Sequence, residues 1–461
     1  MTLKRVEGQE QPFIPLGMFR LRLPFVHYKI TGPEILMGLI ISFIYFIPVA
    51  LYENLFGLPK EQSYALIHIS LWLLLLHNHF GDYGIGGWIT AALPLIVAHV
   101  SAYPQGTERL YALMSIQIWI GVITLVLGVT GLAKRLIEYL PQSLKAGILL
   151  GASVTGFWVV LSPLSKSKWM IEKAPYGIGL SALFLFLLWS YPLIAKSKKV
   201  VQIRKMMSLA LPIGFLLGGV IGTIAGEIPL PEMKWGFVHA DYSVMWKFSL
   251  LGVGFPSMSI FLAAFPLSIL IYIIAYGDFV FVESVVSAGQ TRRLDEKIDV
   301  NAGRAHIIVG VRNFIHTLIG PHPILAGPAF PAYTAIVIDR WQKGKDMDSL
   351  FGGLCTAVIF TIVGSYLGPI VSAVSQSLII ALALALLLQG FICAYVAMSM
   401  IKYVQQAGIA MCMAMVLATR GAAWGIGTGI VLYLLLEFRK KREDRFETIK
   451  PVLLTEKQET T

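Results

Sequence analysis

Charged residues are scarce in this sequence. Only 14% of the 461 residues are Asp, Glu, Lys or Arg, whereas a soluble domain of ordinary composition carries roughly 25%. At the same time, 56% of the residues are hydrophobic and the mean hydropathy is +0.72. This balance excludes an ordinary soluble domain and indicates that lipid covers much of the surface.

Cysteines and enzyme motifs are scarce as well. The three cysteines, Cys355, Cys393 and Cys412, lie within apolar runs and none has a partner at metal-ligand spacing, so no disulfide or zinc framework is expected. The sequence has no Gly-Lys-Ser/Thr phosphate loop, no His-Glu-x-x-His motif and no Gly-x-Ser-x-Gly motif. We therefore expect neither a pump of the phosphate-loop class nor an enzyme, and no cofactor other than a coupling ion.

The net charge of +11 does not indicate a nucleic-acid partner, because the basic residues lie in short clusters between apolar runs. Cytoplasmic loops of membrane proteins carry an excess of Lys and Arg. If both termini are cytoplasmic, most of the basic residues fall on that side, including the clusters at 4–22, 196–205 and 439–442. The pattern predicts a multi-pass inner-membrane protein with both termini in the cytoplasm and the lipid bilayer as its surroundings.

Long apolar runs recur along the chain. A bilayer core about 30 Å thick needs ~20 apolar residues per helix. We predict an all-α integral membrane protein with about fourteen transmembrane segments, at approximately 33–53, 62–79, 86–101, 110–131, 143–162, 176–195, 206–225, 257–286, 300–319, 327–339, 349–366, 373–399, 403–418 and 421–437. The third and tenth segments are short, follow Gly/Pro-rich stretches and are expected to be interrupted helices.

The two halves of the chain resemble each other weakly. Gln142-Ser-Leu precedes Gly156-Phe157, and Gln376-Ser-Leu precedes Gly390-Phe391 at the same spacing. Because each half has an odd number of segments, the halves would insert with opposite topology, and such inverted repeats are typical of transporters. We predict a first repeat at 1–228 (segments 1–7), a second at 229–437 (segments 8–14) and a cytoplasmic tail at 438–461; chance similarity is the alternative.

The interrupted segments predict the substrate site. Half-helices that begin near Gly86 and Pro328 would point free N–H groups and positive dipole ends toward the protein interior, which suits an anion. Trp88 and Phe330 would stack on a planar substrate, and His322 would donate to an anion or relay a proton; ordinary packing is the alternative for all three. The candidate substrate-binding residues are Gly86, Gly87, Trp88, His322, Gly327, Pro328, Ala329 and Phe330.

Ionisable residues inside membrane segments are costly and mark functional positions. Asp278 ends a long charge-free run and is our candidate to bind Na⁺ or carry a proton, with a structural partnership as the alternative. Glu283 is a second cation-coupling candidate nearer the cytoplasmic exit, although it lies roughly 140° around the helix from Asp278. Arg312 is expected to pair with a carboxylate or a carbonyl, and His77 and His79 are expected to be structural or interfacial.

Several short motifs resemble the superfamily shared by uracil/xanthine permeases and sulfate permeases. The motifs are Phe46-Ile-Pro48, Tyr139-Leu-Pro-Gln-Ser-Leu-Lys-Ala-Gly147, Pro266 with Tyr276-Gly-Asp278, and Asn301-Ala-Gly303 with Asn313, Gly320 and Pro323. The resemblance implies a seven-plus-seven inverted repeat in which the third and tenth half-helices hold the substrate. It also implies a core domain of segments 1–4 and 8–11, a gate domain of segments 5–7 and 12–14, elevator-like motion between them, and a homodimer.

The leading hypothesis is a Na⁺- or H⁺-coupled transporter of a small inorganic oxyanion or organic carboxylate. Nucleobase permeases of this superfamily carry a glutamate in the eighth segment and another at the start of the tenth. The corresponding positions here, Ile274 to Tyr276 and Ala329, hold no carboxylate to accept hydrogen bonds from a nucleobase ring. A proton-coupled permease for a uracil- or xanthine-like solute is for this reason only the second hypothesis, and a passive anion channel is the third.

Overall fold

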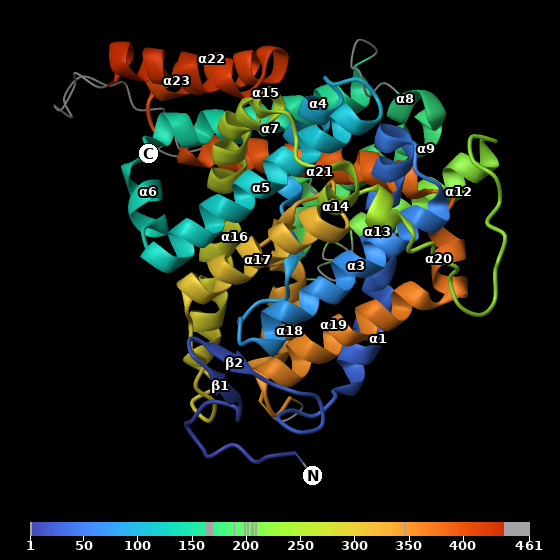
Figure 1. The fold of residues 1–461 in the computed structure, drawn as a ribbon, viewed down its shortest axis with the longest axis vertical. Helices are drawn as coiled ribbons and strands as arrows, with labels where there is room; N and C mark the ends of the chain where they lie inside the picture. The colour runs from blue at the N-terminus through green and yellow to red at the C-terminus, as the bar shows by residue number, and fades with distance from the viewer. Residues whose placement is uncertain are drawn as a thin grey trace, which may run out of the picture.

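A computed structural model describes residues 2–162, 169–188, 190–197, 200, 202, 203, 207, 210–344 and 347–437. The fold is mainly helical (Figure 1). The tail predicted at 438–461 and the basic residues at 198, 199, 204, 205 and 439–442 lie outside the described residues.

The helices are α1 (Gly32–Ile41), α2 (Ile47–Leu51), α3 (Lys60–His79), α4 (Leu93–Val100), α5 (Thr107–Thr130), α6 (Ala133–Tyr139), α7 (Gln142–Leu161), α8 (Trp169–Lys173), α9 (Pro175–Leu188), α10 (Tyr191–Ser197), α12 (Ala210–Ile224), α13 (Val244–Lys247), α14 (Leu250–Val253), α15 (Met258–Ala263), α16 (Phe265–Gln290), α17 (Ala302–Ile319), α18 (Pro331–Trp341), α19 (Leu350–Tyr366), α20 (Gly368–Val374), α21 (Leu378–Met400), α22 (Val404–Arg420) and α23 (Ala422–Leu436). Short 3₁₀ segments at Ser42–Phe46 and Thr90–Ala92 and a π segment at Tyr52–Phe56 join some of them. The strands are β1 (Ile14–Leu16), β2 (Phe19–Leu21), β3 (Gly87–Trp88) and β4 (Ala326–Gly327).

Five helical stretches among the described residues are long and apolar enough to cross a membrane. They are Gly32–Phe56, Thr107–Thr130, Gln142–Leu161, Met258–Gln290 and Leu378–Met400. Shorter apolar helices accompany them, at Thr90–Val100, Pro175–Leu188, Ile213–Ile224, Leu350–Tyr366 and Ala422–Leu436. The chain is thus a multi-pass helical membrane protein, and the count of fourteen segments stays a prediction.

The helices pack in two groups. Helix α7 contacts α21, α22 and α23, α22 also contacts α23, and α9 and α12 join this group through α21. Helices α5, α16 and α17 pack together, as do α1, α3, α18 and α19, and α17 also contacts α3. In Figure 1, α7, α22 and α23 lie at the end of the molecule opposite the N-terminal hairpin β1–β2. These groups resemble the expected gate and core sets, although the domain division itself stays a prediction.

Equivalent positions of the two predicted repeats meet inside the first group. A methyl group added at Gly156 of α7 would lie 3.5 Å from the Cα of Gly390 in α21, and one added at Gly390 would lie 3.2 Å from the carbonyl oxygen of Ser153. These glycines belong to the two matching sequence motifs. Small residues at such a crossing let helix backbones approach closely inside a membrane.

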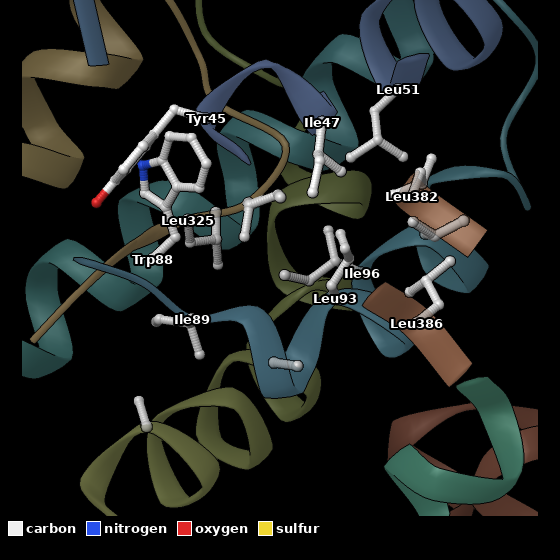
Figure 2. Close-up of a cluster of buried hydrophobic side chains, with 14 of the residues drawn as sticks. Tyr45, Ile47, Leu51, Trp88, Ile89, Leu93, Ile96, Leu325, Leu382 and Leu386 are labelled. Atoms are coloured by element: carbon white, nitrogen blue, oxygen red, sulfur yellow. The ribbon is translucent and has the colours of Figure 1, made fainter. Parts of the chain in front are cut away.

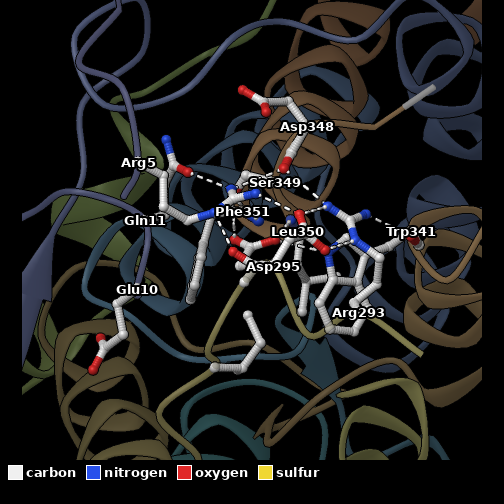
Figure 3. A network of polar contacts seen from close by, with 12 residues as sticks. Arg5, Glu10, Gln11, Arg293, Asp295, Trp341, Asp348, Ser349, Leu350 and Phe351 are labelled. Atoms are coloured by element: carbon white, nitrogen blue, oxygen red, sulfur yellow. Dashed lines mark hydrogen bonds and ion pairs between the residues drawn. The ribbon is translucent and has the colours of Figure 1, made fainter. Parts of the chain in front are cut away.

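The N-terminal segment ties together loops that are distant in sequence (Figure 3). Arg5 donates to the Asp295 carboxylate at 2.7 Å and to the Asp348 carbonyl at 2.8 Å. Arg293 donates to both carboxylate oxygens of Asp295, at 2.7 and 2.9 Å, and this pairing lowers the pKa of the Asp295 carboxyl. The loop between α16 and α17 is therefore bound both to the N-terminal segment and to the segment before α19.

A fully buried carboxylate lies at the centre of this network. Glu296 accepts hydrogen bonds from the Trp341 indole N–H at 2.7 Å, the Ser349 hydroxyl at 2.5 Å and the Leu350 backbone N–H at 3.0 Å. Burial nevertheless raises the pKa of the Glu296 carboxyl. Because these donors come from the end of α18 and the start of α19, Glu296 fixes how those two helices join.

We expect Glu296→Ala to lower the free energy of unfolding by ~2–4 kcal/mol, because it leaves buried donors without an acceptor. The readout is the melting temperature of the purified protein in detergent. Asp348→Ala is the matched control, since the hydrogen bonds from Arg5 and Arg293 go to the Asp348 carbonyl. Equal melting temperatures for Glu296→Ala and the wild type would contradict this account.

Candidate functional site

Two Gly-containing stretches from opposite halves of the chain form one antiparallel pair. In this pair Gly87 of β3 is aligned with Gly327 of β4, and Trp88 is aligned with Ala326. Two further backbone bonds extend the pair, from the Ile89 N–H to the Leu325 carbonyl at 3.0 Å and from the Phe330 N–H to the Ile85 carbonyl at 2.8 Å. Non-helical backbone in a membrane protein must be satisfied internally, and here the two breaks satisfy each other.

The pair changes where the helices start. We expected half-helices from near Gly86 and Pro328, but the first helical residues are Thr90 and Pro331. That expectation was wrong by about one turn, because the intervening backbone groups are used in strand pairing and are not available to a helix. Pro94 and Pro331 lie in the first turns of α4 and α18, where proline costs no hydrogen bond.

Both helix starts lack a capping side chain. Neither Ile89 nor Phe330, the residues at the N-cap positions, provides a side-chain hydrogen bond. Thr90 and Ala332 in the first turns are exposed, although the strand pair beside them is buried. The first N–H groups of a helix have no partner within it and carry a partial positive charge. The arrangement therefore offers two uncapped, electropositive helix ends on either side of one strand pair.

Two polar side chains of helix α17 support the pair. The Asn313 amide donates to the Ala326 carbonyl at 2.9 Å and accepts from the Ala326 N–H at 3.2 Å, which mimics a neighbouring strand. The Arg312 Nη1 atom donates to the carbonyls of Gly87 at 3.1 Å and Gly327 at 3.0 Å. Arg312 thus pairs with carbonyls, one of the two partners expected for it, and joins both strands.

The aromatic residues of the site pack against each other. The Trp88 indole N–H donates to the Ser70 hydroxyl at 3.0 Å, and its rings lie 4.8 Å from Tyr45 and 4.5 Å from His322 by ring centroids. Figure 2 shows Tyr45 beside Trp88 within an apolar cluster. Phe330 is half-buried and its ring centroid lies 6.4 Å from that of Tyr45. With neighbours on the indole, Trp88 is poorly placed to stack on a planar substrate.

The structure brings most of the predicted substrate-binding residues together. The predicted residues that lie buried at or next to the strand pair are Gly86, Gly87, Trp88, Gly327, Pro328 and Ala329. His322 is fully buried, and its Nδ1 atom lies 2.7 Å from the Ile324 carbonyl oxygen. Its role at the site stays a prediction.

The two cation-coupling candidates lie on α16, outside the strand pair itself. A methyl group added at Gly84 would lie 3.0 Å both from Val282 and from Ala329, so Val282 of α16 lies next to Gly84 in the first break. Asp278 is one helical turn before Val282 and therefore on a similar face. Its side chain is half-buried, whereas Glu283 is exposed. This placement suits Asp278 better than Glu283 for a role near the site.

Sequence reasoning missed the connections among polar residues. His77, expected to be structural or interfacial, is fully buried and lies 2.5 Å from Asp82 and 2.7 Å from Arg312. His79 is partly buried and bonds to the Tyr28 hydroxyl at 3.0 Å. The sequence showed only that Arg312 and Asp82 are charged residues in otherwise apolar surroundings. That observation predicts that each has a partner but does not identify the partner.

Comparison with solved structures identifies the fold. The transmembrane domain of a cyanobacterial bicarbonate transporter, BicA, superposes with a TM-score of 0.50 at 14% identity, over 86% of this chain and 97% of that one. Murine Slc26a9, an anion transporter solved in an inward-facing state, gives a TM-score of 0.49 at 16% identity, over 88% of this chain and 69% of that one. By sequence, no family profile and no curated protein matches.

The close approach of the two strands at Gly87 leads to a testable prediction. A methyl group at this position would lie 2.5 Å from the carbonyl carbon and oxygen of Ala329 and 2.6 Å from the Phe330 nitrogen. We expect Gly87→Ala to separate the strands and to cost ~1–3 kcal/mol of stability, measured as a lower melting temperature. Gly408→Ala is the control, because an added methyl there meets nothing within 4 Å. Similar melting temperatures for the two variants would contradict the close approach.

Proposed function

We infer that this chain, a remote member of the superfamily of uracil/xanthine and sulfate permeases, is a secondary active transporter of a small anion. The substrate class is an inorganic oxyanion or an organic carboxylate. The observation that carries the proposal is the meeting of two uncapped helix N-termini at one strand pair. Each such end stabilises a negative charge by roughly 0.3–1 kcal/mol when exposed and by up to ~2 kcal/mol when partly buried.

The charges around the pair favour an anion over a cation. The two breaks at 81–90 and 320–330 contain a single carboxylate, Asp82. Asp82 is 2.5 Å from His77 and accepts the Tyr83 N–H at 2.8 Å, so its oxygens are already used. Arg312, by contrast, brings a buried cation to within 3.1 Å of carbonyls on both strands. Arg312 thus places a positive charge in direct contact with both strands.

We assign the coupling role to Asp278, with Na⁺ or H⁺ as the ion and Glu283 nearer the cytoplasmic exit. Asp278 lies within the apolar stretch Met258–Gln290, where an ionised carboxylate is costly unless it has a function or a partner. The helix that carries it contacts α5 and α18 in one packing group and α7 and α23 in the other. A cation bound at Asp278 would therefore influence how the two groups sit against each other.

The proposed motion is elevator-like, with a core that carries the strand pair past a gate. The contact between α4 and α21 is apolar, because Leu93 and Ile96 face Leu382 and Leu386 (Figure 2). Pro94 of α4 also lies against Gly156 of α7. A smooth apolar contact suits sliding because no polar bonds need to break. We place the protein in the inner membrane with both termini cytoplasmic, and we propose a homodimer.

The direct test is uptake by purified protein in proteoliposomes. We expect saturable, concentrative uptake of at least one anion among bicarbonate, sulfate, molybdate and aromatic carboxylates when a Na⁺ or H⁺ gradient is imposed. Failure of every anion under both gradients would overturn the proposal. Uptake of uracil or xanthine instead would support the permease hypothesis, and steady currents without accumulation would support a channel.

Coupling is tested with Asp278→Asn, which removes the charge and keeps the shape. We expect cation-driven accumulation to be lost while the melting temperature stays near that of the wild type. Asp339→Asn is the matched control, because Asp339 is an exposed carboxylate on α18 that pairs only with the exposed Lys343 among the described residues. Undiminished accumulation by Asp278→Asn would refute the role assigned to this residue.

A further inference from the structure

Arg312 is the most deeply buried cation near the strand pair. Its side chain is fully buried, and its Nη1 atom lies within hydrogen-bonding distance of His77 at 2.7 Å, the Gly87 carbonyl at 3.1 Å and the Gly327 carbonyl at 3.0 Å. These three acceptors belong to α3, β3 and β4. One nitrogen of the guanidinium therefore joins both halves of the chain at the proposed site.

The hydrogen bonds determine which nitrogen of His77 carries the proton. A guanidinium group only donates, so the His77 Nε2 atom must accept from Arg312. The remaining proton is then on Nδ1, which donates to the Asp82 carboxylate at 2.5 Å. Asp82, His77 and Arg312 thus form a chain in which a neutral imidazole separates the carboxylate from the cation. The positive end of this chain contacts the carbonyls of both strands.

Arg312 has two further donor atoms besides Nη1. Among the described residues, its Nε and Nη2 atoms have no hydrogen-bond partner although both are buried. The buried polar atoms that share this property include the Tyr45 hydroxyl, His316 Nε2 and His322 Nε2. The Tyr45 and His322 rings both pack against Trp88 of β3, and the His316 ring lies 5.5 Å from that of His322. A buried donor without an acceptor is costly, so the Arg312 donors and the Tyr45 hydroxyl suit a polar ligand that carries negative charge. His316 and His322 place Nδ1 at carbonyl oxygens, so their Nε2 atoms are acceptors in the neutral ring and are not part of this donor set.

We propose that Arg312 is the fixed positive charge that selects anions at the strand pair, and that His77 and Asp82 are positioning residues that orient it. This inference rests on the proposed function and adds a specificity-determining residue to it. In this arrangement, the uncapped helix ends give the substrate hydrogen-bond donors, and Arg312 gives the site its preference for a charged substrate over a neutral one of similar shape. The imidazole keeps Asp82 from forming a direct ion pair with Arg312, so the cation is not neutralised at close range.

A purely structural role makes a different prediction. If Arg312 only braced the strands, Arg312→Gln would weaken binding of a charged ligand and of a neutral ligand of the same shape by similar factors. If the charge of Arg312 selects the anion, Arg312→Gln weakens binding of the charged ligand much more than binding of the neutral one. Asp82→Ala removes the acceptor that holds His77, so it should weaken binding of the charged ligand in the same selective way but to a smaller extent.

The experiment measures equilibrium binding of the anion that the wild type transports best, by isothermal titration to purified full-length protein. For Arg312→Gln we expect the dissociation constant to rise at least ~10-fold, and for Asp82→Ala we expect a smaller rise. Binding of a neutral analogue, such as benzamide against benzoate, shows whether Arg312→Gln loses the preference for charge. Size-exclusion profiles and melting curves check that both variants are folded.

Each outcome decides the matter. Equal anion affinity in Arg312→Gln and the wild type, or an equal loss of affinity for benzoate and for benzamide in Arg312→Gln, would overturn the inference. If Arg312→Gln does not fold, Asp82→Ala decides alone: a loss of affinity for benzoate that exceeds the loss for benzamide supports the role of Arg312, and equal losses or no loss overturn it. If the wild type binds no anion, it is the proposed function that fails, which is a distinguishable result.

Discussion

The backbone pairing between β3 and β4 is the interaction on which the rest of the structure depends. Each strand is a non-helical stretch between helices inside an apolar protein, and each stretch alone would leave N–H and C=O groups without partners. By pairing Gly87 with Gly327, the chain satisfies both breaks at once and joins its two halves. Glycine at these positions is a steric requirement, because a side chain at Gly87 would collide with the backbone of Ala329 and Phe330.

Three consequences follow from this pairing. The helices after the strands begin beside the pair, so their uncapped N-termini lie together. Helix α17 must supply polar groups to the outer edges of the strands, and Asn313 and Arg312 do so. The pair must also be carried by a stable frame, and the buried Glu296 and the arginines around Asp295 fasten the helix ends and the N-terminal segment of that frame. Such bracing suits the elevator-like motion proposed above.

Much of this architecture could be predicted from sequence, because hydropathy and Gly/Pro-rich breaks are local signals. The membrane class, the superfamily resemblance and the residues of the two breaks followed from such signals. The strand pairing could not be predicted, because two-residue strands have no periodicity and their partners are distant in the sequence. The role of His77 was missed for the same reason: only the fold brings it between Asp82 and Arg312. Helix starts were misplaced by about one turn because strand pairing took the first backbone groups.

The central claim is that an anion binds between the helix starts at Thr90 and Pro331. The most direct measurement is a crystal structure with a heavy oxyanion such as molybdate, located by its anomalous scattering. The account predicts a peak within hydrogen-bonding distance of the first backbone N–H groups of both helices, on the side of the strand pair where Arg312 contributes positive charge. A peak only among the arginines of the N-terminal network, or no peak at a concentration that saturates transport, would contradict it.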